Sequence, residues 1–557
     1  MKKRNKYLYL FVLFLSVWFL VNLFQSIFTE ITNDEAYYAL WGKMLDWGYF
    51  DHPPLVAIFT HLSSLMFNDN LGVRFITIIT QLFTLLMIWK IADLKIDSKK
   101  TVFNFFIVSA SIVMFNAYGF ITTPDVPLLF FATLFLYAYK RFLKEENILN
   151  SLFISFAIVG MLYSKYHGAL LVAFVVLSNP KLILNSKFLM SLFIALVGFV
   201  PHLRWQLQHD FPALQYHLFD RSSSFSWKYF IEYLPNQLLV FNPFTLVAVV
   251  WVMFIKRKLD VFDRALYTIV FGFIVFFWCM SFRGHVEPHW TIIAAIPIII
   301  IIVGESQINL SIRRYIQRFI LPSLLLIIMV RLLLVTDYLP HRLALNGKEE
   351  KYIELHKIAK GCPVIIRGSF EHPSLYRFFT DGKTQLISSL YTRRTQFDIW
   401  KFEKDFYGKR VLITGDYNGR SEMLATVNET RFVGFFTDSL QITNDLEVDY
   451  NLKSILFNKG DTISLPIQIH NNSIQQYEIH HSVFPGNVIV LLFKNDKMIE
   501  VPAICKITDI IKPDESSSSD LKFVVPDEND GRYKFAISFK SWFGPTLNSR
   551  VTSVILQ

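Results

Sequence analysis

Long apolar runs alternate with short polar segments from the N-terminus to about residue 338, which is typical of a chain that crosses a membrane many times. The first run, 8–28, is about 21 residues long and can cross a hydrocarbon core of ~30 Å. A charged hexapeptide precedes it, but the run is too long for a signal peptide and no small-residue cleavage site follows. We therefore expect an uncleaved first membrane helix.

Further apolar runs predict more spans, which brings the expected total to about eleven. Several runs are shorter than ~17 residues, so broken or tilted helices are expected among them. The runs are 71–90, 101–118, 126–143, 148–163, 168–178, 188–201, 238–255, 265–282, 290–303 and 319–337.

The pattern changes beyond residue 340 to that of a water-exposed protein. Strand-like runs mixed with polar helical stretches predict a small α/β domain, and short alternating runs between turn residues then predict a β-sandwich. The expected fold class is a mainly α polytopic membrane protein with an exported C-terminal α/β and β-sandwich region. The expected domains are 1–340, 341–440 and 441–557.

Composition agrees with a membrane protein, because 53% of the 557 residues are hydrophobic and only 18% are charged. A soluble protein of this size carries more charge to solvate its surface. The net charge of +10 does not indicate a nucleic-acid partner, since Lys and Arg gather in alternate loops. One set of loops holds about 20 cations and the opposite set about six. This asymmetry predicts a cytoplasmic N-terminus, and an odd number of spans then places residues 339–557 outside.

The first outer loop carries adjacent carboxylates, Asp34 and Glu35, just past the first span. Either one could act as the general base that glycosyl transfer needs, or could help to hold a metal ion or a cationic partner. The alternative is helix capping, with Asp34 before an Ala-Tyr-Tyr-Ala-Leu-Trp segment. Asp51-His52-Pro-Pro follows on the same loop, where two prolines stiffen the backbone. Asp51 is a candidate ligand of a divalent metal ion, His52 could bond a phosphate, and a plain turn is the alternative.

Three motifs, DEAYY at 34–38, GYFDHPPL at 48–55 and TPDVPL at 123–128, resemble those of the bacterial branch of the dolichyl-phosphate-mannose protein mannosyltransferase family. This branch includes the aminoarabinose lipid A transferase and the lipopolysaccharide galacturonosyltransferases, which are GT-C glycosyltransferases. The resemblance covers about residues 1–340. It implies a polytopic GT-C fold and a polyprenyl-phosphate-linked sugar donor.

The resemblance also implies roles for single residues. The family's acidic pair falls on Asp34 and Glu35, with the Asp as the catalytic candidate, and its second outer-loop Asp falls on Asp125. The acidic residue of the middle motif falls on Asp51. The aminoarabinose transferase has a Lys in contact with the donor phosphate where this chain has His52, so the match to aminoarabinose transfer is weakened.

Two other outer loops suit an anionic donor. Lys165 lies between two apolar runs, and Arg283 begins the segment RGHVEPHW, so each could stabilise the charge that develops on a leaving phosphate. Anchoring at the membrane interface is the alternative for both. His289 in the same segment, with His285 and Glu287, is a further candidate metal ligand. Arg74 and Arg204 are candidates that interface snorkelling explains equally well.

These features together predict a membrane glycosyltransferase. Asp34 would deprotonate an acceptor hydroxyl, which would displace polyprenyl phosphate held by Arg283, Lys165 and His52, with inversion at the anomeric carbon. The acceptor would be lipid A or lipopolysaccharide, another glycan, a membrane lipid or a protein. The alternatives are a transporter or flippase for lipid-linked sugars, which should show internal repeats and polar groups at mid-span, and a non-catalytic envelope assembly protein.

The cation asymmetry makes a direct prediction about topology. A reporter that is active only in the cytoplasm, fused after Gln557, should be silent, and the same reporter at the N-terminus should be active. A bright C-terminal fusion would contradict the predicted orientation and would move the loops of interest to the cytoplasmic side.

Overall fold

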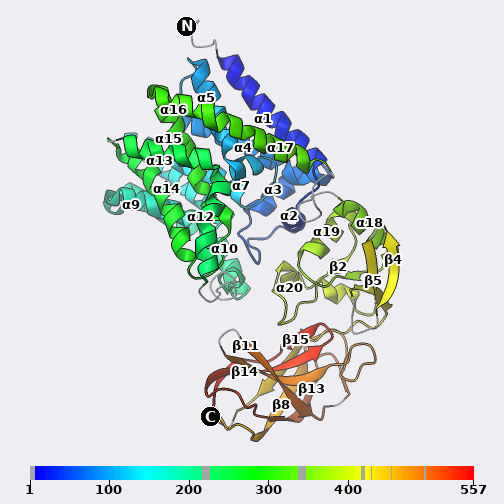
Figure 1. The fold of residues 1–557 in the computed structure, drawn as a ribbon. Helices are drawn as coiled ribbons and strands as arrows, with labels where there is room; N and C mark the ends of the chain where they lie inside the picture. Colours follow the sequence, from blue (N-terminus) through cyan, green and yellow to red (C-terminus); the bar gives the residue numbers. More distant parts are fainter. Residues whose placement is uncertain are drawn as a thin grey trace. The chain divides into compact units, whose positions relative to one another are not determined.

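The computed structural model describes residues 7–215, 226–256, 258–336, 347–415, 421–427, 430–452, 454–494, 497–507 and 509–557. The chain divides into two compact units, Met1–Glu349 and Glu350–Gln557 (Figure 1). The boundary predicted near residue 340 falls within 337–346, outside the described residues. The further division of the C-terminal region at residue 441 stays a prediction.

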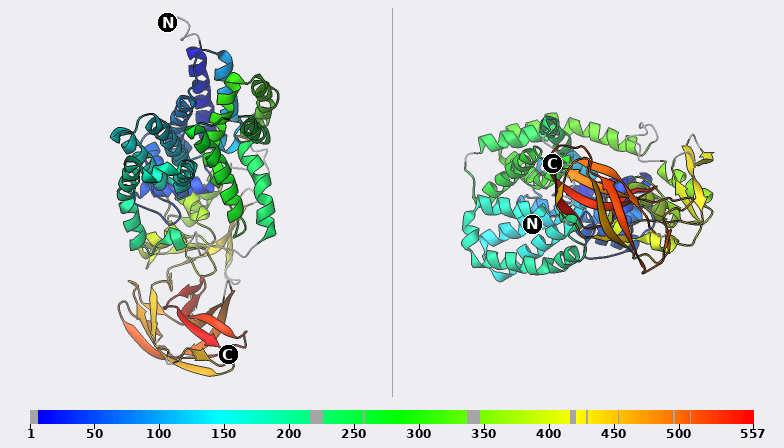
Figure 2. Two further views of the ribbon diagram at one scale, coloured as in Figure 1. Left: turned by 90° about the vertical axis from the view of Figure 1, so that its left-hand side faces the viewer. Right: turned by 90° about the horizontal axis from the view of Figure 1, so that it is seen from below.

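The first unit is a bundle of helices, seen from two further sides in Figure 2. Its described helices are α1 Leu8–Phe28, α2 Asn33–Lys43, α3 Leu55–Ser64, α4 Asp69–Ile91, α5 Lys99–Ser111, α6 Val113–Ala117, α7 Asp125–Lys144, α8 Ile148–Ser164, α9 Gly168–Ser178, η1 Pro180–Leu184, α10 Ser186–Gln208, α11 Pro212–Gln215, α12 Trp227–Phe241, α13 Pro243–Ile255, α14 Val261–Met280, η3 Pro288–Ala294, α15 Ala295–Ile308, α16 Leu310–Tyr315, η4 Ile316–Ile320 and α17 Leu321–Leu334.

The predicted count of about eleven spans needs correction. Within the described residues, seven helices are long and apolar enough to cross a membrane, or eight if a bent pair counts as one span. The predicted runs 148–163 and 168–178 form helices that are too short to meet this criterion. The run 101–118 is broken at Ile112 into α5 and α6. The polytopic, mainly helical prediction is confirmed in this coarser form.

The bent pair is α12 and α13, which meet at an angle of 95°. Asn242, between them, has a left-handed φ of 68°, and its side chain accepts a hydrogen bond from the Phe244 N–H. Pro243 follows as the first residue of α13 and has no N–H with which to continue α12. The prediction of one continuous span at 238–255 is therefore wrong at this dipeptide.

The helices differ in how they are surrounded, although their sequences are equally apolar. Helix α15 is buried on all sides along Ala295–Val303, and it packs against α5, α13 and α14. Helix α17 has no buried residue. We therefore expect its apolar side chains to face the lipid. Composition alone could not separate these two environments.

The segment 29–70, which the sequence predicts to be the first outer loop, contains two short helices, α2 and α3, that pack together. The Thr60 hydroxyl donates to the Tyr38 carbonyl at 2.9 Å, and His61 Nδ1 bonds the Gly42 carbonyl at 2.8 Å. A Cβ on Gly42 would lie 2.4 Å from Thr60 Oγ1, so this approach of α2 to α3 requires glycine. The loop that carries the predicted acidic motifs is therefore a rigid cap on one end of the bundle.

The second unit is β-rich, as predicted. Helix α18 (Lys348–Ala359) leads into it from the first unit. Its other described elements are β1 Val364–Ile365, α19 Glu371–Thr380, β2 Thr384–Gln385, α20 Gln396–Trp400, η5 Phe402–Phe406, β3 Val411–Thr414, β4 Glu422–Val427, β5 Thr430–Thr437, β6 Leu446–Tyr450, β7 Leu456–Phe457, β8 Thr462–Asn471, β9 Tyr477–Glu478, β10 Asn487–Lys494, β11 Lys497–Cys505, β12 Ile510–Ile511, β13 Ser516–Val524, β14 Gly531–Ser541, β15 Gly544–Leu547 and β16 Thr552–Leu556.

Two larger sheets organise this unit. The first has the order β2-β1-β3-β5-β4, with β1 parallel to both of its neighbours. The second runs β6-β8-β13-β11-β10-β14-β16-β7, and β11 pairs with β10 through its first half and with β13 through its last residues. Alternate residues of β8, β10 and β14 share one apolar core, as the period of two in a strand requires.

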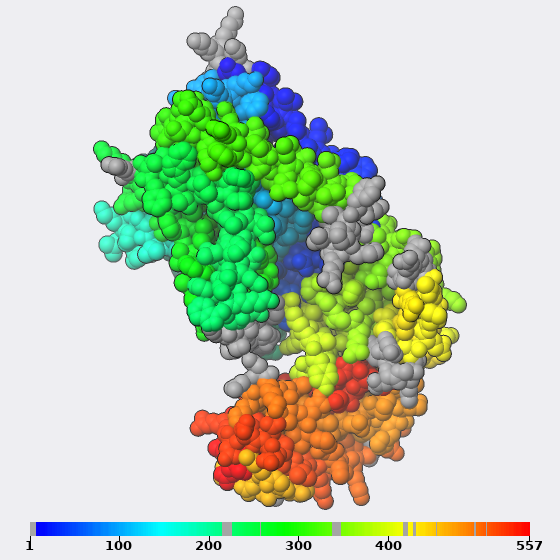
Figure 3. Space-filling model, viewed as in Figure 1, coloured from blue at the N-terminus to red at the C-terminus, as the bar shows by residue number. Residues whose placement is uncertain are grey.

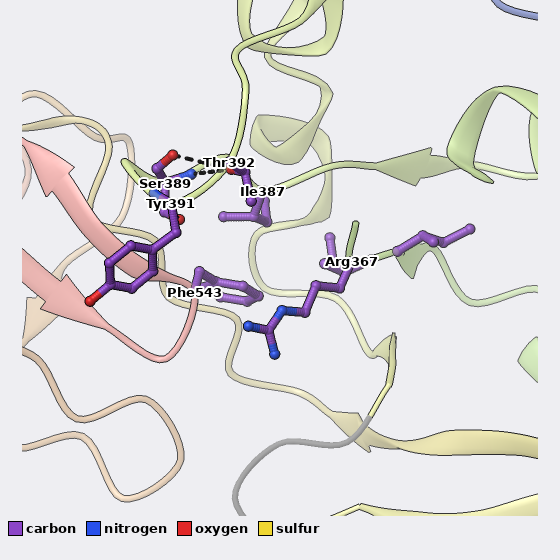
Figure 4. A pocket seen from close by; sticks show the side chains of 8 residues that line it. Arg367, Ile387, Ser389, Tyr391, Thr392 and Phe543 are labelled. Atoms are coloured by element: carbon purple, nitrogen blue, oxygen red, sulfur yellow. Dashed lines mark hydrogen bonds between the residues drawn. The ribbon is translucent and has the colours of Figure 1, made fainter. Parts of the chain in front are cut away.

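A small pocket lies at the carboxyl ends of the parallel strands β1 and β2 (Figure 4). Arg367 follows β1, Ser389 and Thr392 follow β2, and Phe543 closes the pocket from the turn before β15. The cavity volume is about 20 Å³, which holds roughly one water molecule. It is too small for a sugar, so we assign it no binding role.

A buried carboxylate in this unit makes its stability depend on pH. Glu403 is 6% exposed, and burial together with the nearby Asp445 raises its pKa from 4.5 to about 7. Its Oε2 atom accepts no hydrogen bond from the described residues. The folded unit therefore binds this proton more tightly than the unfolded chain does, and its stability falls as the pH rises through the window from 4.5 to about 7.

The substitution Glu403→Gln should remove this cost. At pH 8 it should stabilise the second unit by up to about 3 kcal/mol, whereas at pH 4.5 it should have little effect. Thermal unfolding of the full chain in detergent at the two pH values measures the difference. An effect of the same size at both pH values would contradict the assignment.

Candidate active site

Glu35 is fixed by its own helix. Thr32 caps α2, its hydroxyl accepts from the Glu35 N–H, and the Thr32 N–H donates to Glu35 Oε2 at 2.8 Å. This reciprocal capping box points the Glu35 side chain back into the bundle, where it is completely buried. Asp34, in the same first turn, is exposed. The adjacent carboxylates thus lie in opposite environments.

Arg74, on α4, is the charge partner of Glu35. Its Nε donates to Glu35 Oε1 at 2.7 Å and its Nη2 donates to Oε2 at 2.6 Å, and neither side chain is exposed to solvent. The guanidinium also donates to the carbonyls of Ser26, Thr29 and Glu30 at the end of α1. Neither a phosphate contact nor snorkelling, the two interpretations left open for Arg74 by the sequence, agrees with this geometry.

Thr122 joins the third motif to the same carboxylate. Its backbone N–H donates to Glu35 Oε1 at 2.9 Å, and its hydroxyl bonds Thr77 and the Val73 carbonyl of α4. Asp125 follows three residues later at the start of α7. The buried pair therefore fixes the segment that carries Asp34 and the segment that carries Asp125 against one another.

Asp125 is the centre of a cluster of polar side chains. Its Oδ2 accepts from Lys165 Nζ at 2.8 Å and from the Tyr118 hydroxyl at 3.3 Å, and His289 Nε2 lies 3.7 Å away. Asp125 and Lys165 are both buried, and the His289 side chain is 30% exposed. Asp125 Oδ1 has no hydrogen-bond partner among the described residues. Three side chains singled out from three separate loops of the sequence thus meet here.

The Asp51-His52 turn lies beside α2. Asp51 is buried, and the His52 ring is 6.3 Å from Tyr38 and 6.4 Å from Trp41 between centroids. The His52 carbonyl accepts from the Tyr49 N–H at 3.1 Å. Asp51 and His52 therefore lie against the aromatic side chains of α2.

Arg283 and its neighbours lie in the segment between α14 and η3. Arg283 is exposed, and His285 lies 3.6 Å from Glu287 rather than at the Asp125 cluster. Within the part of the chain that the structure describes, no three His, Cys, Asp or Glu side chains gather closely enough to hold a metal ion. In the described part of the chain, Asp51 and His289 therefore belong to no such group.

The end of α10 makes a set of contacts that was not predicted from the sequence. His202 Nδ1 bonds the Trp47 carbonyl at 2.7 Å, and its Nε2 bonds the Tyr166 hydroxyl at 2.9 Å. Trp205 Nε1 donates to Asp46 at 2.7 Å. Through α10, these bonds connect the turn between α2 and α3 to the loop that carries Lys165. Polar and aromatic residues three positions apart at the end of an apolar run were the available signal.

Comparison with known proteins identifies a family for part of the chain and a similar fold. Residues 51–205 match the profile of a family described as dolichyl-phosphate-mannose-protein mannosyltransferase. Among curated proteins, none matches the chain by sequence. Two solved structures of ArnT from Cupriavidus metallidurans, apo and bound to undecaprenyl phosphate, are similar in fold, with TM-scores of 0.54 and 0.55 and 14% identity. Each comparison covers 76% of this chain and 97% of that chain.

The resemblance predicted from the three motifs is confirmed by the family match, and the likeness to the solved structures shows the fold. Part of the candidate site lies within the matched residues, namely Asp51, His52, Asp125 and Lys165. The rest lies outside them, namely Asp34, Glu35, Arg283 and His289.

Because the two adjacent carboxylates lie in opposite environments, substitutions at Glu35 and at Asp34 should change the stability of the protein by different amounts. Glu35→Gln should destabilise the protein by about 3–5 kcal/mol, because it leaves the Arg74 charge buried without a counter-charge. The matched control Asp34→Asn, at an exposed position, should change stability by no more than about 0.5 kcal/mol. Thermal unfolding in detergent compares the two variants. Equal melting temperatures would contradict the structural role of Glu35.

Proposed function

We propose that this chain, whose residues 51–205 belong to the dolichyl-phosphate-mannose-protein mannosyltransferase family, transfers a sugar from a polyprenyl-phosphate donor to an envelope acceptor on the outer face of the membrane. The enzyme class, a polyprenyl-phosphate-sugar-dependent glycosyltransferase, follows from the family match. The observation that carries the proposal is the Asp125–Lys165–His289 cluster, which is fixed through Glu35 to the loop that presents Asp34.

Asp34 is the general base of the proposed reaction. It is exposed in the first turn of α2, where an acceptor hydroxyl can reach it. Glu35 cannot share this role, because its two oxygens already accept four hydrogen bonds from Arg74, Thr32 and Thr122. We assign Glu35 as a positioning residue that fixes the direction of Asp34.

Cationic side chains supply the charge for the donor phosphate. One of the three N–H groups of Lys165 donates to Asp125, so the others can donate to a phosphate oxygen. Arg283 is exposed and can approach from the opposite loop with a bidentate fork. His52, beside Tyr38, completes the proposed set. Asp125 holds Lys165 in place through their ion pair at 2.8 Å.

The reaction is a single displacement. The acceptor oxygen attacks the anomeric carbon while its proton passes to Asp34, and the bond from that carbon to the phosphate oxygen breaks. Polyprenyl phosphate leaves with the electron pair, and the cationic side chains stabilise the charge that develops on it. Attack from the face opposite the leaving group inverts the anomeric centre. No observation in the described residues favours the alternative of a lipid-linked-sugar transporter.

The proposed base is tested by one matched pair of variants. Asp34→Asn should lower transfer by ~10²-fold or more in a reconstituted membrane supplied with polyprenyl-phosphate sugar and envelope extract. Asp69→Asn makes the same change at another exposed position of the same outer loop and should retain activity within a few-fold. Near-normal transfer by Asp34→Asn would exclude it as the base, and mass spectrometry of the product identifies the sugar and the acceptor.

A further inference from the structure

Arg331 is a cation within a candidate membrane span. It lies in the last turn of α17, which ends the apolar segment Leu310–Leu334 (α16, η4 and α17) that is long enough to cross a membrane. The end of the helix is three residues away, which corresponds to roughly 4.5 Å along the axis. A charge at this depth is costly and needs a compensating partner.

The partners of Arg331 within the protein are uncharged amides. Its Nη1 donates to Asn116 Oδ1 at 2.9 Å, its Nη2 to Asn22 Oδ1 at 2.9 Å, and its Nε to Gln25 Oε1 at 3.3 Å. The guanidinium also lies 4.7 Å from the centre of the Phe120 ring. Three segments, α1, α6 and the loop that carries Phe120, thus converge on one cation.

Among the described residues, no carboxylate balances the charge of Arg331. Every ion pair within 4.0 Å there is formed by another cation. Arg74 shows the contrast, since it meets Glu35 at 2.6 Å in the same bundle. Amide oxygens satisfy hydrogen bonds, but they leave the net charge of +1 in place. Arg331 therefore needs an anion that the described part of the chain does not provide.

The guanidinium can be reached from the lipid. Its remaining contact, from Nη2 to the Val21 carbonyl, is long at 3.5 Å and lies at an exposed edge of the bundle. Val21 and Phe24 on α1 and Ile328 and Leu332 on α17 are exposed around it. Figure 3 shows the green surface of α17 beside the blue surface of α1, with no other helix over either. An anion at this edge would replace the weakest of the four hydrogen bonds.

We propose that Arg331, with Asn22, Gln25 and Asn116, forms a binding site for the phosphate of a membrane lipid between α1 and α17. Phosphates are the anions present at this depth, and a guanidinium binds them through two parallel N–H donors. The lipid chains would lie along the exposed apolar side chains of the two helices. This site uses none of the residues proposed to contact the donor phosphate, namely Lys165, Arg283 and His52. Its phosphate can come from a bulk phospholipid or from a polyprenyl phosphate.

Binding of defined lipids to the full chain in dodecyl maltoside, measured by native mass spectrometry, tests the proposal. The probes are phosphatidylglycerol, undecaprenyl phosphate and, as the phosphate-free control, diacylglycerol. Wild-type protein should bind at least one phosphate lipid ~10-fold more tightly than diacylglycerol. Arg331→Gln should lose this preference, and Arg331→Lys should keep part of it, because the charge remains without the planar fork.

The two sources give different results. If Arg331→Gln loses only the binding of phosphatidylglycerol, the site is a phospholipid site. If Arg331→Gln loses the binding of undecaprenyl phosphate and Arg283→Gln does not, the site is a second one for the polyprenyl carrier. Equal affinities of wild type and Arg331→Gln for both phosphate lipids would overturn the proposal and leave Arg331 as an anchor of α17. If Arg331→Gln does not fold, the lipid preference of wild type against Arg331→Lys decides, and a wild type that binds diacylglycerol equally well overturns the proposal.

Discussion

The buried ion pair between Glu35 and Arg74 is the interaction on which the rest of the candidate site depends. Removing two charges from water is expensive, and their attraction offsets that cost only when every remaining donor and acceptor is satisfied. Here the carboxylate accepts backbone N–H groups from Thr32 and Thr122, and the guanidinium reaches carbonyls at the end of α1. One ion pair thus fixes α1, α2, α4 and the segment that carries Thr122. The direction of the exposed Asp34 is set by these segments.

Much of the fold could be predicted because its signals are local. Apolar length located the spans at 8–28, 71–90 and 126–143 within two residues of the helices observed, and strand alternation located 464–470, 487–493 and 533–539 within β8, β10 and β14. The count of spans failed where a local break interrupts an apolar run. Asn242-Pro243 bends one helix by 95°, and Ile112 interrupts another without any glycine or proline to mark the position.

The candidate site was predictable as a set of residue types but not as a set of partners. The sequence singled out Asp125, Lys165 and His289 separately, and it gave no means of knowing that they meet, because 40 residues separate the first two. It also gave no means of knowing that Glu35 is buried while Asp34 is exposed. Their difference arises from the capping box and from Arg74, 39 residues further along the chain, so it is a property of packing rather than of the motif.

The order of the chain has a consequence for how this protein is assembled during synthesis. Glu35 precedes Arg74, so the carboxylate is already at the membrane face when the ribosome delivers α4 and its buried cation. We expect the counter-charge of Arg74 to be available when α4 is inserted, so that the guanidinium is not left unpaired in hydrocarbon. Thr122 is made later and bonds a carboxylate that α2 and α4 already hold. We expect the amino-terminal third of the membrane unit to form the template on which the later helices assemble.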